Sequence, residues 1–312
     1  MKILFIADIH IKVGQKNVPK DWQINRYKMF FEKVAEVSKT VDLTVLGGDI
    51  FDKTPNLEEI ELYFELIGNL KSPNNIVFDG NHEATKRGHT FLHKLKSSTE
   101  LLNSNVEVLT EPCVRFGMDF IPYTHLKTFN PNDFDNTILF THVRGEILPH
   151  VKPEINLTKL ERWNIVLAGD LHSYTNCQRN ILYPGSPLSV SFHRNPIDNG
   201  YIIFDSDTLL HSWHSFGLPQ LLRRTVDDQA LMIPTDFDHT IYELEGTETE
   251  LSQIEDNVLL DKKVSRKVRD ASLNLSGVDT IPGELRLYLE KVVKLPKEEI
   301  DDILGVFNDY IT

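Results

Sequence analysis

Carboxylate, imidazole and amide side chains recur in this 312-residue sequence directly after short apolar runs. The motifs are Asp8-Ile9-His10, Gly47-Gly48-Asp49-Ile50-Phe51-Asp52, Gly80-Asn81-His82-Glu83, Thr141-His142 and Gly169-Asp170-Leu171-His172. Each apolar run is typical of a buried strand, and the ends of strands are where layered α/β sheets keep their functional sites. The five motifs therefore predict one site assembled from five loops.

The residue types in these motifs indicate metal ligands. Carboxylate, imidazole and amide groups without a thiolate favour divalent ions such as manganese, iron or zinc over a structural cysteine-zinc site. The motifs offer more ligands than one ion needs. A carboxylate that bridges two ions is typical of sites that activate water and stabilise the leaving oxygen in phosphoryl transfer. We therefore expect a two-metal phosphoesterase site, although each motif alone is weak and Asp52 could simply cap a helix.

The apolar patterns predict the elements that position this site. Strands are expected at residues 3–7, 43–46, 76–78, 106–109, 115–122, 137–141, 165–168, 201–205 and 209–215, with helical periodicity at 24–38 and 57–70. Strands and helices alternate at first, and few helices separate the later strands. This pattern predicts a layered α/β fold in which the second half of the sheet is mixed.

The chain is expected to divide into three parts, at residues 1–217, 218–280 and 281–312. Residues 216–219 form a linker, and strands at 222–226 and 240–244, a helix at 248–257 and a basic strand at 262–272 suggest a small α/β capping module. The last part predicts two helices with apolar stripes. Either the stripes pack against the capping module or they bind another protein.

Charge is distributed unevenly along the chain. The net charge is −13, yet residues 1–224 hold 24 Lys and Arg against 26 Asp and Glu. Residues 225–261 hold eleven acids and no Lys or Arg. A nucleic-acid partner is thus compatible with the first part, where Lys86, Arg87 and His89 could meet a phosphate backbone or be ordinary surface charge.

Features of secreted and membrane proteins are lacking in the sequence. It has two cysteines outside any CxxC pair, an acidic residue close after the first apolar run, and no apolar run long enough for a membrane span. We expect a cytoplasmic protein without a membrane partner.

The order of the five motifs resembles the calcineurin-like metallophosphoesterase superfamily over about residues 1–215. The resemblance implies a layered mixed-sheet sandwich, followed by a small α/β capping domain and C-terminal helices. The resemblance implies that one ion is held by Asp8, His10, Asp49 and His172, and that Asp49 bridges to a second ion held by Asn81, His142 and Asp170. It implies that His82 is no ligand but protonates the leaving group or stabilises the transition state, for which imidazole is suited near neutral pH.

One position departs from the family pattern. The family usually carries GHxH in its last motif, and this chain has Asp170 in place of the first histidine. A carboxylate can still bind a metal, and its charge favours manganese or magnesium over zinc. The alternative is a weakened second metal site.

The segment Tyr183-Pro184-Gly185-Ser186-Pro187 resembles the SbcD nuclease family, which acts in DNA repair, recombination and replication. The resemblance implies a manganese-dependent DNA exonuclease and endonuclease in which magnesium is also possible. It further implies a homodimer, an SMC-like ATPase partner of the SbcC type bound by the C-terminal helices, and a substrate-binding role for Ser186. Two alternatives stay open. Glu83 suggests a phosphomonoesterase like the protein phosphatases, and Asp170 suggests a scaffold without activity.

Overall fold

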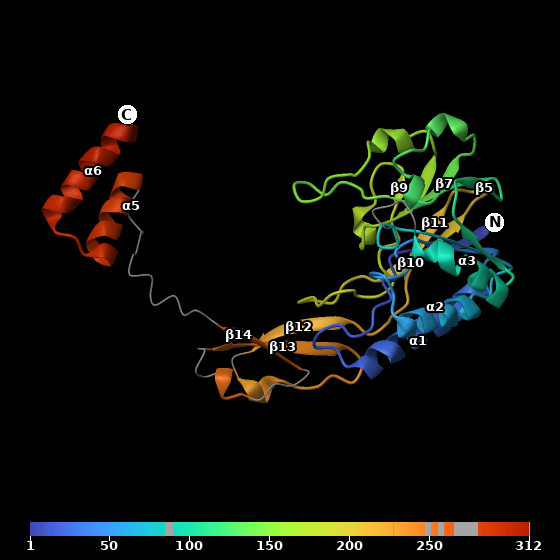
Figure 1. The fold of residues 1–312 in the computed structure, drawn as a ribbon, viewed down its shortest axis with the longest axis horizontal. Coiled ribbons are helices and arrows are strands. Elements are labelled where there is room, and N and C mark those ends of the chain that lie inside the picture. Colours follow the sequence, from blue (N-terminus) through green and yellow to red (C-terminus); the bar gives the residue numbers. More distant parts are fainter. Residues whose placement is uncertain (85–89, 227, 247–250, 255–258, 265–279, 312) are drawn as a thin grey trace. The chain divides into compact units, whose positions relative to one another are not determined.

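The computed structural model describes residues 1–84, 90–226, 228–246, 251–254, 259–264 and 280–311 (Figure 1). The chain divides into two compact units. The first is Met1–Glu243 with Asp256–Asp261, and the second is Leu244–Glu255 with Lys262–Thr312. All five motifs lie in the first unit.

A six-stranded sheet in the order β11-β10-β1-β2-β3-β4 forms half of the first unit. The four strands β1 (Lys2–Ile6), β2 (Leu43–Gly47), β3 (Asn74–Phe78) and β4 (Val106–Leu109) are parallel, and β10 (Gly200–Asp205) and β11 (His211–Ser215) join antiparallel. Parallel strands point their carboxyl ends at one edge, so the motifs that follow β1, β2 and β3 emerge side by side.

A second sheet has five strands in the order β5-β6-β7-β8-β9. They are β5 (Cys113–Arg115), β6 (Met118–Ile121), β7 (Ile138–His142), β8 (Ile165–Gly169) and β9 (Ile181–Leu182). The two mixed sheets confirm the predicted mixed-sheet sandwich. One expectation was wrong, since the single strand expected at 115–122 is a hairpin, because Phe116 and Gly117 turn the chain with φ of 55° and 71°.

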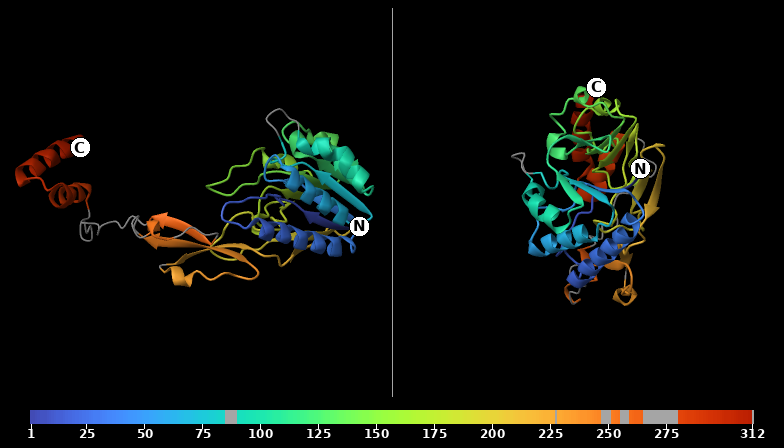
Figure 2. Two further views of the ribbon diagram at one scale, coloured as in Figure 1. Left: turned by 60° about the horizontal axis from the view of Figure 1, so that its bottom comes forward. Right: turned by 90° about the vertical axis from the view of Figure 1, so that its right-hand side faces the viewer.

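Alternating side chains of the first sheet face two different cores. Phe5 and Phe78 lie with Phe120, Phe140 and other residues of the second sheet in a core between the two sheets. The neighbouring strand residues face α1 (Lys20–Ser38), α2 (Leu57–Asn69) and α3 (Phe91–Leu102), which cover the other side of the first sheet (Figure 2). Period-two strands thus produce the predicted layers, although the sequence did not indicate α3.

Short helices and irregular segments cover the outer face of the second sheet. The 3₁₀ helices of the chain are η1 (Tyr123–His125), η2 (Pro131–Asp133), η3 (Leu157–Leu160), η4 (Tyr174–Asn176) and η5 (Gln229–Leu231). Trp163 and Tyr183 are fully buried in this third core.

The later part of the chain contains a three-stranded sheet in the order β12-β13-β14, with bounds Leu221–Val226, His239–Gly246 and Leu260–Val264. The expected helix at 248–257 is described only at 251–254, and the expected strand at 262–272 only as far as 264. The expected borders at 217 and 280 stay predictions.

The C-terminal segment forms α5 (Ile281–Tyr288), a π-helical turn η6 (Leu289–Val293) and α6 (Lys297–Ile311). Leu289, Ile300 and Leu304 form a small apolar cluster, with Leu285 and Leu295 packed against it. Val292, Val293 and Ile303, also part of the predicted stripes, remain exposed. Among the described helices, none is both long and apolar enough to cross a membrane.

Candidate metal centre

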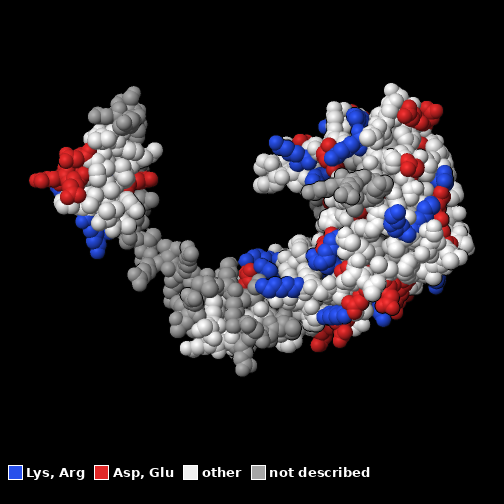
Figure 3. Space-filling view, viewed as in Figure 1, with Lys and Arg blue, Asp and Glu red and all other residues white. Residues whose placement is uncertain are grey.

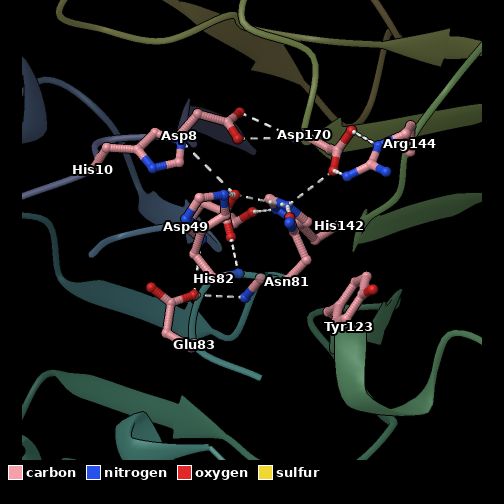
Figure 4. Close-up of polar contacts among 12 residues, drawn as sticks. Asp8, His10, Asp49, Asn81, His82, Glu83, Tyr123, His142, Arg144 and Asp170 are labelled. Carbon is pink, nitrogen blue, oxygen red and sulfur yellow. Dashed lines mark hydrogen bonds and ion pairs between the residues drawn. The ribbon is translucent and has the colours of Figure 1, made fainter. Parts of the chain in front are cut away.

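The five motifs meet where strands of the two sheets end (Figure 4). Asp8 and His10 follow β1, Asp49 follows β2, and Asn81 and His82 follow β3, while His142 ends β7 and Asp170 and His172 follow β8. All seven predicted ligands and His82 therefore lie in one cluster. Its His and Asp ligand atoms form groups that lie within 4.8 Å of one another, including Asp8 with His10 and His172, and Asp8 with Asp49 and His142.

Asp49 lies between two groups of ligands. Its Oδ1 accepts the backbone N–H of His82 at 2.8 Å. Its Oδ2 lies 3.7 Å from His10 Nε2 and 3.4 Å from His142 Nε2. One carboxylate oxygen thus faces both groups while the other is held by the backbone, which is the arrangement a bridging ligand requires.

Ring nitrogens of the histidines converge on the same site. His142 Nδ1 lies 2.9 Å from the carbonyl oxygen of Gly47, which can only accept, so Nδ1 carries a proton and Nε2 is the ring atom that faces Asp49. His10 Nε2 lies 3.1 Å from His172 Nε2. Imidazole nitrogens directed at one another and at a carboxylate are a donor set that suits divalent cations.

Asn81 supports the same interpretation. Its Oδ1 lies 2.9 Å from His142 Nε2, and with the amide turned over its nitrogen would donate to His142, Asp49 and Asp170. A bound cation would select the orientation with the oxygen inward. The residues present therefore fit divalent metal ions, for which carboxylate, imidazole and amide ligands are suited.

Four of the predicted ligands adopt left-handed backbone conformations that L residues avoid. The φ angles are 58° at Asp8, 49° at His10, 50° at Asp49 and 101° at Asp170. Such residues cost about 1–3 kcal/mol each and persist where their surroundings hold them. Five other described residues besides glycine also have a positive φ, but these four share one site, where the strained backbone directs their side chains inward.

Two buried side chains hold this strained backbone. Glu83 accepts the N–H groups of Asp49, Phe51 and Gly80 at 2.8–2.9 Å. Tyr27 of α1 donates from its hydroxyl to the His10 carbonyl at 2.9 Å. The sequence indicated neither role, because both depend on segments that meet only in the folded chain.

Gly80 is fixed by the approach of Asp49. A Cβ atom at Gly80 would lie 2.2 Å from Asp49 Oδ1 and 2.4 Å from the Asp49 backbone nitrogen. No side chain fits at that separation, so glycine is required for the β2 and β3 loops to meet.

The buried charges shift each other's pKa strongly. Burial raises the pKa of Asp8 well above its usual range, and burial lowers that of His10 to about 3. Burial opposes charge at Asp49 and His142 too, but their mutual attraction outweighs it. The pKa of Asp49 is therefore lowered and that of His142 raised. Burial, followed by the charge of Asp49, raises the pKa of Glu83 to about 8, against the effect of its N–H donors.

His82 differs from the predicted ligands. Its side chain is 37% exposed, its Nδ1 lies 2.6 Å from the carbonyl oxygen of Asp52, and its Nε2 lies 3.9 Å from Asp49 Oδ2. The carbonyl acceptor implies that Nδ1 carries a proton, which leaves Nε2 at the open side of the site.

The predicted substrate-binding residues have separate outcomes. Lys86, Arg87 and His89 lie outside the described residues. Ser186 is buried, with its hydroxyl 2.7 Å from the carbonyl oxygen of Asp8 and 2.6 Å from that of Leu188. Its substrate role stays a prediction.

The structure adds a cavity and a cation that the sequence did not single out. The cavity, of about 420 Å³, begins at His172 and is lined by apolar and small polar residues that include Leu188, Ser191 and Asn199. The cation is Arg144, two residues beyond His142, which pairs with Asp170. Its position two residues after a predicted ligand was the only signal in the sequence.

Comparisons with known proteins show the family of this chain. Residues 1–198 match the model of the calcineurin-like phosphoesterase family. Over 323 aligned residues the chain is 43% identical to the "Probable exonuclease subunit 1" of Escherichia phage T5, covering 100% of this chain and 99% of that protein.

Two more distant similarities were found. The chain is 23% identical over 223 residues to the "Putative phosphoesterase 244L" of Invertebrate iridescent virus 6, covering 65% of this chain and 75% of that protein. The crystal structure of TT1561 of Thermus thermophilus superimposes with a TM-score of 0.44 at 12% identity, covering 69% of this chain and 98% of that one. On the family match and the full-length relative, the chain belongs to the calcineurin-like phosphoesterase family.

Proposed function

We propose that this chain is the nuclease subunit of an SbcC-SbcD-like complex, with two divalent ions, most favourably Mn²⁺, as cofactors. The observation that carries the proposal is Asp49, whose Oδ2 faces both His10 and His142. The DNA substrate rests on the full-length similarity to a phage protein named as an exonuclease subunit. The reaction would be hydrolysis of phosphodiester bonds at DNA ends.

The proposed metal ligands divide around Asp49. One ion would be held by Asp8, His10, Asp49 and His172, and the other by Asp49, Asn81, His142 and Asp170. When bound, such a pair supplies Lewis acidity to the attacking water and to the phosphoryl oxygens.

The protein side chains supply orientation and a proton. Glu83 and Tyr27 hold the backbone of Asp49 and His10, so the ligands need little rearrangement when an ion binds. His82 presents Nε2 to the site while Nδ1 is held by the carbonyl oxygen of Asp52. As an imidazolium, with both ring nitrogens protonated, His82 would donate its Nε2 proton to the departing 3′ oxygen.

The cavity beside His172 offers room for the part of the substrate next to the cleaved phosphate. Figure 3 shows basic and acidic side chains interspersed on the visible face of the first unit. Recognition would rely on local phosphate contacts near the site, for which Lys86, Arg87 and His89 remain candidates.

The partner would bind through the C-terminal helices. Val292, Val293, Ile303 and Val306 of η6 and α6 are exposed apolar residues, and an amphipathic helix pair of this kind suits binding to a helical partner. We propose an SMC-like ATPase of the SbcC type as that partner, and a homodimer of this chain within the complex.

Cleavage of linear double-stranded DNA by the full chain tests the proposal. Cleavage should require Mn²⁺, stop in EDTA, and fall by at least about a hundredfold in His82→Ala. The matched control is His211→Ala, since His211 is an exposed residue of β11. Hydrolysis of nitrophenyl phosphate without cleavage of DNA would favour the phosphomonoesterase instead. If no ester is cleaved with both ions bound and an SbcC-type partner present, the remaining interpretation is a scaffold without activity.

Deletion of residues 284–312 tests the partner site separately. The shortened chain should keep its basal nuclease activity and lose binding to the ATPase. Loss of basal activity would mean that these helices stabilise the catalytic unit.

A further inference from the structure

Asp170 is paired with an arginine through both carboxylate oxygens. Arg144 Nε lies 3.1 Å from Asp170 Oδ2, and Arg144 Nη2 lies 3.2 Å from Asp170 Oδ1 (Figure 4). The Asp170 side chain is only 5% exposed, whereas that of Arg144 is 42% exposed. A two-pronged pair of this kind fixes the plane of the carboxylate as well as its position.

Asp170 needs such a partner because it lies among other acids. Its backbone N–H donates to Asp8 Oδ1 at 3.0 Å, which brings two carboxylates onto adjacent positions. Its Oδ1 lies 3.9 Å from His142 Nε2, the atom that also faces Asp49. Like charges at this spacing repel in a buried site, and the guanidinium of Arg144 offsets that repulsion.

Arg144 is itself held in place. Its backbone N–H donates to Glu154 Oε1 at 3.1 Å, and the other oxygen of Glu154 accepts the hydroxyl of Tyr123 at 2.9 Å. The ring of Tyr123 lies edge-on to His142 at 6.0 Å between centroids. The arginine therefore belongs to a set of contacts around His142 and is not a free surface residue.

The pair leaves Asp170 able to bind a metal. Each carboxylate oxygen has two lone pairs, and Arg144 uses one on each oxygen. The second lone pair of Oδ1 remains, and this oxygen is the one nearer to His142. Partners that orient a ligand in this way are commonly worth about 10- to 100-fold in metal affinity.

We propose that Arg144 is a positioning residue that makes Asp170 an effective ligand of the second ion by fixing its carboxylate and offsetting its charge. This inference rests on the two-ion site of the proposed function. It explains how Asp170 can bind a metal at the position where the family usually has a histidine, because Arg144 orients the carboxylate and offsets its charge.

Mn²⁺ titration of the full-length chain by calorimetry tests the inference without using activity. Arg144→Ala should lower the affinity for the second ion by about 10- to 100-fold and change the affinity for the first ion by less than about threefold. Arg144→Lys, which keeps the charge and loses the fork, should recover part of the loss. The control is Arg179→Ala, since Arg179 is equally exposed at 42% and pairs with Glu161 away from the metal centre. It should bind both ions normally.

The decisive step repeats the substitution without the carboxylate. In an Asp170→His background, Arg144→Ala should change the affinity for the second ion by less than about threefold, because no charge remains to be oriented or offset. An equal loss in both backgrounds, or normal affinity in Arg144→Ala, would overturn the inference. Circular dichroism of the metal-free variants should show unchanged folding.

This result is separable from that of the nuclease assay. The wild-type chain could bind two Mn²⁺ ions, and Arg144→Ala could weaken the second ion as expected, while the chain does not cleave DNA. This outcome would support the role of the Arg144–Asp170 pair and contradict the proposed nuclease activity. If the wild-type chain binds a single ion, both the proposed role of the Arg144–Asp170 pair and the two-ion site are contradicted.

Discussion

Removal of one hydroxyl from α1 should destabilise the fold and loosen the metal centre. Tyr27 is fully buried, donates to the carbonyl oxygen of His10 at 2.9 Å and accepts the N–H of Lys12 at 3.0 Å. Tyr27→Phe removes this oxygen and leaves the ring, so packing in the core of the helical layer is kept. The strained backbone of His10 then loses the hydrogen bond that its carbonyl oxygen accepts from Tyr27.

The cost follows from the two groups that lose their partner. The buried His10 carbonyl is left unpaired, which costs about 1–3 kcal/mol. The Lys12 N–H is partly buried, and replacement of its partner by water adds roughly 0.5–1 kcal/mol. We expect the free energy of unfolding to fall by about 1.5–4 kcal/mol.

Urea unfolding of the metal-free chain, followed by circular dichroism, measures this loss. Tyr201→Phe is the matched control, because Tyr201 lies in the same apolar cluster and its hydroxyl has no hydrogen-bond partner among the described residues. The control should change the free energy of unfolding by about 0.5 kcal/mol or less. A loss in Tyr27→Phe no larger than that of the control would refute the proposed hold on His10.

Three further predictions concern the buried charges. Above pH 8, where Glu83 is ionised, Glu83→Gln should lower the free energy of unfolding by roughly 1–3 kcal/mol, because an amide keeps one acceptor oxygen for three N–H donors; Glu65→Gln on the exposed face of α2 is the control, and an equal effect of both would contradict this. Folding lowers the pKa of His10 from 6.5 to about 3, so the folded chain keeps His10 neutral where the unfolded chain protonates it. The folded state is therefore not penalised by His10 above pH 6.5 and loses stability as the pH falls from 6.5 towards 3. In EDTA, wild type should therefore lose roughly 2 kcal/mol more than His10→Gln between pH 6.5 and 5, and parallel pH profiles in urea would count against the shift. Mn²⁺ at about a hundred times its Kd should stabilise the chain by about 2.7 kcal/mol per ion, which a thermal melt reversed by EDTA checks; an unchanged melt at saturating Mn²⁺ would mean that no specific site exists.

The clustering of the proposed ligands could be predicted from the sequence because each follows a recognisable strand. Ile3 to Ile6 is a continuous apolar run and Leu43 to Leu46 is apolar except for Thr44, and Asp8 and Asp49 come soon after these runs. Parallel strands of one sheet end at one edge, which placed Asp8 and Asp49 together, whereas His142 reaches the same site from the second sheet.

The supporting contacts could not be predicted in this way. Tyr27 and Glu83 act on backbone groups of other loops, and their partners are set by how α1 and the β3 loop pack against the β1 and β2 loops. Arg144 is one of many surface cations until Asp170 is seen beside it. The assignment of each strand to one of the two sheets could not be predicted for a similar reason, since the apolar pattern shows which residues are buried but not the sheet to which a strand belongs.

The number of metal ions held by Asp49 tests the account most directly. Native mass spectrometry and calorimetry of the full chain with Mn²⁺ should give two ions per chain in wild type. Asp49→Ala, confirmed as folded by circular dichroism, should weaken both ions, because its Oδ2 faces His10 and His142 alike. A variant that loses one ion and binds the other with wild-type affinity would contradict the bridging role of Asp49 and with it the two-ion site.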